Sequence, residues 1–229
     1  MRYLDGSQGR SGKCITTAEL GFHRAHDLAV GFVFETDGRA QTTYADGWGD
    51  GQLALLDATY LDLRPGTVIF NAQFDFDVAY PGDYVEYANG FYDALQSYPP
   101  GPLKFGIYGG QRIIEHAQVN WPGVVALWQT LAWSQARPLP YVHIFQYATG
   151  STGAGKVCGV DVDLNHCYDE SVLTKGADMT EEQVRAIMRD FIANEYGPAL
   201  EAELQQRFAD NSSADVAAAI KAVSQKLAA

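Results

Sequence analysis

Short apolar runs alternate with amphipathic stretches along roughly the first 170 residues of the chain. The runs are rich in β-branched and aromatic residues and are bounded by glycine and proline, which is typical of buried strands, whereas the stretches between them have helical periodicity. This alternation favours a parallel sheet with right-handed crossovers. The predicted strands cover residues 2–4, 29–35, 68–73, 104–108, 124–129, 142–146 and 157–163.

Helices are predicted between most of these strands. Thr16 and Glu19 have the spacing of a capping box and predict a helix start. Residues 47–51, rich in glycine, aspartate and tryptophan, are expected to form a loop that leads into the next helix. The predicted helices cover residues 16–28, the segment from this loop to about residue 63, residues 83–98 and residues 111–118.

The fold class expected from this order is α/β, as a TIM-like (β/α) barrel over residues 1–175. A closed barrel of this type has eight strands, and seven are predicted, so the first strand is expected to be missing upstream of Met1. The barrel would then be closed by another segment, stay open or be completed by a partner chain. Residues 176–229 are predicted to form a helical tail for packing, association or attachment.

Composition narrows the possible partners. The net charge of −12 argues against a nucleic-acid partner, and no segment is apolar enough to span a membrane. The first residues lack the basic and apolar regions of a secretory signal. Cys14, Cys158 and Cys167 have no metal-binding spacing, so they are predicted to be free thiols, with a Cys158–Cys167 bridge as the alternative. No cofactor or metal motif is present.

Acidic and aromatic side chains follow several predicted strands. Asp75 and Asp77 are spaced i, i+2 and would leave the same face of an extended chain. Because the carboxyl ends of parallel strands meet at one rim, the acids there should converge, and glycoside hydrolysis needs two such carboxyl groups. Aromatic side chains suit the apolar faces of sugars. The acids are Asp5, Glu35, Asp75, Asp77, Asp161 and Asp163, and the aromatics are Trp48, Tyr108, Trp128, Trp133 and Tyr147.

The order of several short motifs resembles a known family. These motifs are Arg2-Tyr3-Leu4, Lys13-Cys14-Ile15-Thr16 with Glu19, Phe34-Glu35, the segment from Ile69 to Asp75, Phe105-Gly106-Ile107-Tyr108-Gly109, Leu127-Trp128-Gln129-Thr130, Ala132-Trp133-Ser134, Gln146 and Val160-Asp161-Val162-Asp163. Together they resemble the glycoside-hydrolase-like domains of actinobacteria and their phages, once labelled domain of unknown function 1906. These domains are related to the family 25 glycoside hydrolase lysozymes.

The resemblance implies a phage-encoded protein that acts on actinobacterial cell-wall peptidoglycan or a related glycan, as a lysin or a virion-associated tail hydrolase. Asp75 would be the principal acid/base or nucleophile, Glu35 or Asp161 its partner, and Asp77 a second choice for the partner. The substrate-binding residues would be Tyr108, Trp128, Gln129, Gln146 and Gln73. The protein would act in the virion or outside the cell, at the host wall.

A second hypothesis is a non-catalytic virion protein, such as a minor tail or tail-tip component, that binds the wall or serves as a scaffold. It follows from Gln73, which stands where the family has an acid and cannot ionise. In this hypothesis the helical tail would contact phage tail proteins or a second copy of the chain.

Overall fold

The computed structural model describes residues 1–9, 14–36, 42–121, 123–135, 137–148, 156–157, 160–161 and 163–174. The chain divides into two compact units. The first comprises residues 1–17 and 29–175, and the second comprises residues 18–28 and 176–229. The described part of the second unit is residues 18–28, most of which belong to helix α1 (Thr17–Ala25). The predicted tail, residues 176–229, lies outside the described residues.

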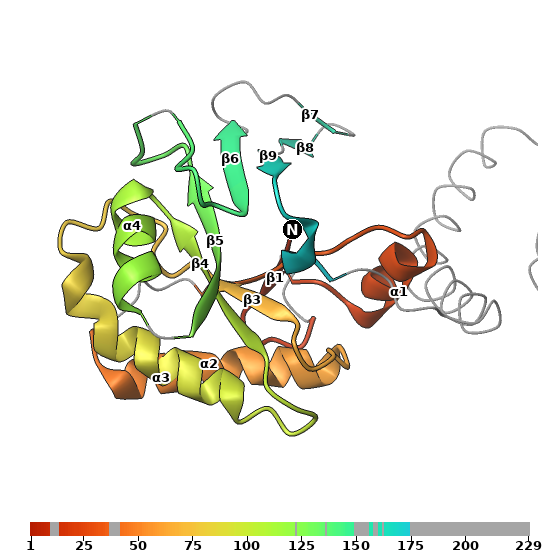
Figure 1. Ribbon diagram of the computed structural model, residues 1–229. Coiled ribbons are helices and arrows are strands. Elements are labelled where there is room, and N and C mark those ends of the chain that lie inside the picture. Colours follow the sequence, from red (N-terminus) through yellow and green to blue (C-terminus); the bar gives the residue numbers. More distant parts are fainter. Residues whose placement is uncertain are drawn as a thin grey trace, which may run out of the picture. The chain divides into compact units, whose positions relative to one another are not determined.

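The first unit is built on a curled sheet of seven strands (Figure 1). Six strands are parallel and follow one another in chain order, and the seventh is antiparallel to its neighbour. The described strands form a half-barrel with β1 and β9 at its two ends, rather than a closed eight-stranded barrel. In sheet order they are β1 (Arg2–Leu4), β2 (Phe32–Phe34), β3 (Val68–Asn71), β4 (Lys104–Gly109), β5 (Val124–Thr130), β6 (Ile144–Ala148) and β9 (Leu164–Cys167).

The first six predicted strands are confirmed, and the seventh is wrong. The segment predicted as one strand over residues 157–163 instead contains β7 (Lys156–Val157) and β8 (Val160–Asp161), which pair antiparallel with each other in a separate small sheet. In the sequence, Gly159 stands between these two short segments, and a glycine at such a place is typical of a tight hairpin connection. The polar segment that follows, β9, is the one that joins the main sheet.

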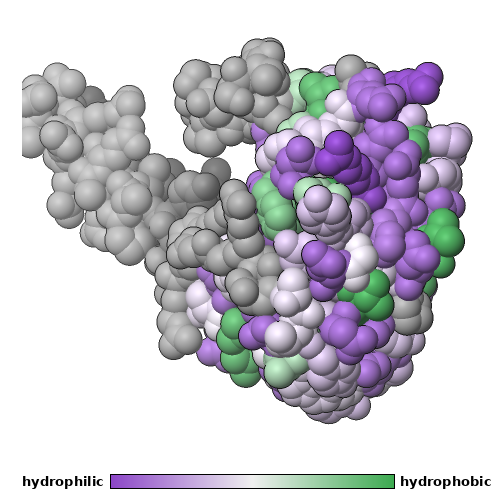
Figure 2. Space-filling view, turned by 90° about the vertical axis from the view of Figure 1, so that its left-hand side faces the viewer, coloured by the Kyte–Doolittle hydropathy of each residue, from purple (hydrophilic) through white to green (hydrophobic). Residues whose placement is uncertain are grey.

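The helices α2 (Tyr44–Tyr60), α3 (Val85–Gln96) and α4 (Gln111–Asn120) cover one face of this sheet (Figure 1). A short 3₁₀ turn, η1 (Pro81–Tyr84), precedes α3, and η3 (Glu170–Val172) follows β9. No helix in the described part of the chain is long and apolar enough to cross a membrane. On the face shown in Figure 2, hydrophilic side chains predominate and the hydrophobic ones are scattered.

The predicted loop at residues 47–51 is wrong, because these residues lie inside α2. Their glycines allow α2 and α3 to pack closely. A Cβ atom added to Gly47 would lie 1.9 Å from the carbonyl oxygen of Tyr87, and one added to Gly90 would lie 2.1 Å from that of Tyr44. The close approach of the two helices therefore requires glycine, which outweighs its low helix propensity.

Side chains alternate between the two faces of the sheet. Phe34 of β2 and Phe105 of β4 face the helices, and both rings pack on Phe91 of α3, at centroid distances of 5.5 and 5.3 Å. The opposite, inner face has its own apolar cluster, formed by Val33, Val68, Phe70, Ala72, Tyr108, Ala126, Trp128, Ile144 and Val172. Beyond this cluster, toward the carboxyl ends of the strands, the inner face becomes polar.

Candidate functional site

A cavity of about 470 Å³ opens on the inner face of the half-barrel, near the carboxyl ends of the parallel strands. Glu35 comes two residues after the buried Val33 and therefore shares its face, because side chains alternate along a strand. Asp75 reaches the cavity from the turn that follows β3. The polar lining also includes Arg2, Tyr108, Gln146, Asp163 and Asn165, and Ala72 and Trp128 contribute to the apolar wall.

Gln146 of β6 is the centre of a hydrogen-bond network in this cavity. Its side chain is 4% exposed and accepts hydrogen bonds from the hydroxyls of Tyr108, at 3.0 Å, and Thr130, at 2.5 Å. Its amide nitrogen donates to Oδ2 of Asp163 at 2.9 Å. All of these groups come from strand ends that the sheet brings together. The network therefore fixes the position of one cavity carboxylate.

The aromatic residues of the cavity are held in a similar way. The Trp128 indole donates its N–H to Oδ1 of Asn165 on β9 at 2.8 Å. Its ring packs edge-to-face on Tyr108, with centroids 4.6 Å apart. Trp128 is 5% exposed and Tyr108 8% exposed. At these exposures the two rings form a fixed wall of the cavity, and neither offers an open stacking face.

The pKa of Tyr108 is raised above its ordinary value, mainly because the phenol is buried. A hydrogen bond with Thr130 acts in the opposite direction, while the nearby carboxylates of Asp75 and Asp163 and the phenol of Tyr3 raise the pKa further. The phenol therefore stays protonated at neutral pH and acts as a hydrogen-bond donor. The same effects show that Asp75 and Asp163 both lie close enough to Tyr108 to act on it electrostatically.

Five of the residues predicted from the sequence line this cavity: Glu35, Asp75, Tyr108, Trp128 and Gln146. Asp163, which is among the predicted strand-end acids but has no predicted catalytic role, lines it as well. Arg2 is named in the sequence only as part of a family motif, and Asn165 is not predicted as a site residue. Asn165 enters the cavity through the pairing of β9 with β6, where it lies opposite Gln146, and the local sequence carries no signal for this pairing.

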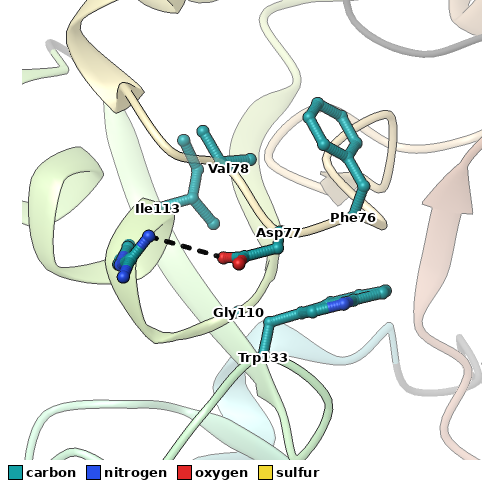
Figure 3. Close-up of a pocket in the computed structure, with 7 residues that line it drawn as sticks. Phe76, Asp77, Val78, Gly110, Ile113 and Trp133 are labelled. Atoms are coloured by element: carbon teal, nitrogen blue, oxygen red, sulfur yellow. Dashed lines mark ion pairs between the residues drawn. The ribbon is translucent and has the colours of Figure 1, made fainter.

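Asp77 lies elsewhere, and the expectation that it shares a face with Asp75 is wrong. The chain is not extended beyond Asn71, because the Asp75 N–H bonds to the carbonyl of Ala72 at 3.1 Å in a turn. The Asp77 carboxylate instead lies 3.8 Å from Arg112 of α4. It lines a separate shallow hollow with Phe76 and Trp133 (Figure 3).

Gln73, predicted to bind substrate, faces the helices instead of the cavity. It is 2% exposed, and its amide nitrogen donates to Oγ1 of Thr36 at 2.7 Å and to Oδ2 of Asp50 at 3.2 Å. Its amide oxygen accepts the N–H of Thr36 at 3.0 Å. Tyr87 of α3 also bonds to Oδ2 of Asp50. Because Gln73 lies outside the cavity, the glutamine at this position does not reduce the number of cavity acids.

Gln129, also predicted to bind substrate, is buried and makes hydrogen bonds that stabilise the fold. It is fully buried, donates to the carbonyl of Arg137 at 3.1 Å and accepts the N–H of Leu139 at 2.8 Å. These bonds tie the segment after β5 back to the sheet. Asp161 lies in β8, and its side chain is outside the described residues, so its predicted catalytic role stays a prediction.

Two aspartates and a cysteine near β1 form another group with metal-ligand chemistry. The side-chain ligand atoms of Asp5, Cys14 and Asp57 lie within 4.8 Å of one another. Asp57 is 2% exposed, and its carboxylate accepts the backbone N–H groups of Asp5, Gly6 and Gln8 at 2.8, 2.8 and 2.6 Å. A cation would have to compete with these three bonds. The carboxylate therefore serves to anchor the loop after β1.

Comparisons with solved structures show a related fold. The Mycobacterium tuberculosis Tat-secreted protein Rv2525c, in complex with L-tartrate, matches with a TM-score of 0.62 and 18% identity over 77% of this chain and 87% of that one. An uncharacterized B. stearothermophilus protein matches with a TM-score of 0.53 and 18% identity, over 76% of this chain and 86% of that one. Glycosyl hydrolase 25 GHIP of Streptococcus pneumoniae has 15% identity over 74% and 77% of the two chains; its TM-score of 0.47 is too low to support an inference.

No curated protein sequence matches the chain significantly. The family model of the Rv2525c-like, glycoside hydrolase-like domain does match, over residues 1–167. This range contains the seven strands of the sheet and all the residues that line the cavity. The chain therefore belongs to the family of Rv2525c-like, glycoside hydrolase-like domains.

Proposed function

We propose that this protein hydrolyses a glycan in the cavity of the half-barrel. The observation that carries the proposal is that three carboxylates, from Glu35, Asp75 and Asp163, line one cavity of about 470 Å³. This volume suits a small ligand or one end of a longer one. Glycoside hydrolysis uses two carboxyl groups, one to protonate the leaving oxygen and one to act as nucleophile or base.

The surroundings of the three acids support different roles for them. Asp163 is held by the Gln146 amide at 2.9 Å, which suits it to position a sugar hydroxyl. Asp75 is exposed and sits on a turn at the carboxyl end of β3, and Glu35 is half-buried beyond the end of β2. We assign Asp75 as the principal acid or nucleophile and Glu35 as its partner.

The proposed substrate is the glycan of a bacterial cell wall, peptidoglycan or a related polymer. The glycoside hydrolase-like family supports a glycan in general. The wall, and the setting of a lysin or a phage tail hydrolase, follow from the resemblance to actinobacterial and phage proteins described above. The net charge of −12 provides no long-range attraction to anionic wall polymers, so recognition would depend on short-range contacts in the cavity.

The test is the release of reducing ends from actinobacterial cell walls by the purified full chain. Asp75→Asn and Glu35→Gln should each lower the rate at least about 100-fold, as expected for loss of a catalytic acid or base. Asp83→Asn and Glu86→Gln are matched controls, because both side chains are exposed on η1 and α3, away from the cavity, and these variants should keep the full rate.

Equal rates for the parent and Asp75→Asn would rule out Asp75 as a catalytic residue. If no variant and no parent releases reducing ends while the protein still sediments with the walls, the cavity binds glycan without cleaving it. The anomeric form of the first product distinguishes a nucleophile from a base, because a covalent intermediate retains the configuration and direct attack by water inverts it.

A further inference from the structure

Trp133 combines two unfavourable features at the same position. It is a large apolar side chain that is 41% exposed, and its backbone has a positive φ of 56°. A bulky residue rarely adopts this conformation, and such strain tends to persist at ligand-binding positions. We therefore look for a function of this exposed indole, because a glycine at this position would relieve both costs.

The turn that carries Trp133 is held firmly in place. The carbonyl of Trp133 accepts the N–H of Gln111 at 3.3 Å, and Oγ of Ser134 accepts the same N–H at 3.0 Å. The Ser134 hydroxyl donates to the carbonyl of Thr130 at 2.6 Å. A Cβ atom added to Gly110 would lie 2.8 Å from Cβ of Trp133, so the start of α4 packs directly against the turn. The indole is thus presented by a fixed support.

The side chains around Trp133 provide both apolar and polar surface. In Figure 3 the ring of Phe76 lies above Asp77 and the indole of Trp133 below it, and the dashed line marks the ion pair of Asp77 with Arg112. The Asp77 and Arg112 side chains are 61% and 63% exposed and lie 3.8 Å apart. An aromatic face beside exposed charged hydrogen-bonding groups is suited to a sugar ring, which has an apolar C–H face and polar hydroxyls at its edge.

This hollow and the cavity are lined by residues that are adjacent along the chain. Asp75 lines the cavity, and Phe76 and Asp77 line the hollow beside Trp133, so the two sites are separated by at most about 7 Å of chain. Thr130 links them from the other side, because its hydroxyl bonds to Gln146 in the cavity and its carbonyl to Ser134 in the turn. Both hollows therefore lie where the segments that follow β3 and β5 meet.

We propose that Trp133 is the platform of a second sugar-binding subsite, which holds a neighbouring unit of the glycan whose end occupies the cavity. The inference rests on the proposed function of the cavity. It makes the protein selective for long oligosaccharides over short ones. Trp128 and Tyr108 cannot supply such a platform, since they are 5% and 8% exposed.

The test compares the affinities of the full chain for β-1,4-linked N-acetylglucosamine oligomers of two and six units by titration calorimetry. Trp133→Ala should weaken binding of the hexamer about 3- to 10-fold, the usual contribution of one aromatic contact, and leave the dimer unchanged. Trp133→Phe should retain most of the hexamer affinity. Trp133→Gly removes the ring and the strain together, and should lose hexamer affinity without loss of stability.

The control is Trp48→Ala, because Trp48 is similarly exposed, at 37%, but lies on α2 and stacks on Tyr44. Equal hexamer affinity for the parent and Trp133→Ala would overturn the subsite while leaving the cavity proposal intact. If the parent binds neither oligomer nor isolated cell walls, both proposals fail. If Trp133→Ala weakens the dimer and the hexamer equally, the residue acts on the cavity itself and the second subsite is refuted.

Discussion

The amide of Gln73 joins the ends of β2 and β3, and Gln73→Glu is the sharpest test of this arrangement. The side chain is 2% exposed and bonds both the N–H and the hydroxyl of Thr36, the residue after Glu35. Its amide nitrogen also lies 3.2 Å from Oδ2 of Asp50. The substitution keeps the shape of the side chain and replaces this donor by a carboxylate oxygen. Two negative oxygens would then face each other in a largely buried place.

The loss of stability expected for Gln73→Glu can be worked out from the distance between the side chains of residues 73 and 50. Two unit charges 3.2 Å apart repel by about 5 kcal/mol at an effective dielectric constant of about 20. The new carboxyl group can avoid this repulsion by binding a proton. Protonation of a group with an ordinary pKa of about 4.3 costs about 4 kcal/mol at pH 7 and about 1 kcal/mol at pH 5. Because protonation costs less free energy than the repulsion, the loss of stability should be limited to about 4 kcal/mol at pH 7 and about 1 kcal/mol at pH 5.

The sign of the pH dependence is fixed by the same argument. The folded state raises the pKa of the new carboxyl group above its unfolded value, so the folded state binds the proton more tightly. The variant should be close to the parent in stability below about pH 4.3 and should lose stability as the pH rises toward neutrality. Urea unfolding at pH 5 and pH 7, followed by tryptophan fluorescence, measures the difference.

A second substitution provides the control. Asp50→Asn in the Gln73→Glu background removes the repulsion and supplies an amide donor, so the double variant should recover most of the stability lost at pH 7. Gln135→Glu, at an exposed position, should have almost no effect. If Gln73→Glu has the same unfolding free energy at pH 5 and pH 7, or if Asp50→Asn gives no recovery, the side chains at positions 73 and 50 do not repel each other as described.

Three further predictions follow from single contacts. Gly90→Ala would place a methyl group 2.1 Å from the carbonyl oxygen of Tyr44 and should cost about 2–3 kcal/mol of unfolding free energy. Gly49→Ala is the control, because no atom lies within 4 Å of the added methyl group, and it should stabilise the protein by about 0.5–1 kcal/mol. Equal effects of the two substitutions in chemical denaturation would contradict the close contact between α2 and α3. The pKa of Tyr108 is raised above its ordinary value of 10.0 in the folded protein, so the unfolded chain loses the proton first and stability should fall as the pH rises above 10. Tyr108→Phe should flatten the dependence of unfolding free energy on pH in this range. An unchanged slope would show that the phenol is not its source. Asp57→Asn replaces one of the two carboxylate oxygens that accept these three N–H groups with an amide donor, and should cost about 2–3 kcal/mol of unfolding free energy. A thermal melt would detect this as a clear decrease in Tm, and an unchanged Tm would refute the anchoring role.

The helix pair α2–α3 shows a limit of local sequence analysis. Glycine, aspartate and tryptophan in residues 47–51 predict a loop from propensity, yet the segment is helical. Two of its glycines, Gly47 and Gly51, meet α3 at distances that no Cβ atom could occupy. Propensity describes an isolated segment, and here the close packing of a helix remote in sequence outweighs it.

The half-barrel could be predicted only in part for a similar reason. Six parallel strands are apparent in the sequence because strands buried on both faces must be apolar along their length. Strand β9 has the sequence Leu-Asn-His-Cys, and its backbone hydrogen bonds to β6, not its composition, place it in the sheet. A strand that joins through backbone pairing at the end of a sheet leaves little trace in the pattern.

The sequence by itself determined the order of strands and helices, and that acids follow β2 and β3, because burial requires apolar runs and short polar segments must connect them. Only the tertiary structure decided which acids share the cavity. The turn after Asn71 sends Asp75 inward and Asp77 toward Arg112, and the pairing of β9 with β6 brings Asn165 and the neighbouring Asp163 to the same place. A side chain's direction depends on the backbone at one or two residues, and its neighbours depend on contacts between segments far apart in the chain, so neither can be obtained from spacing alone.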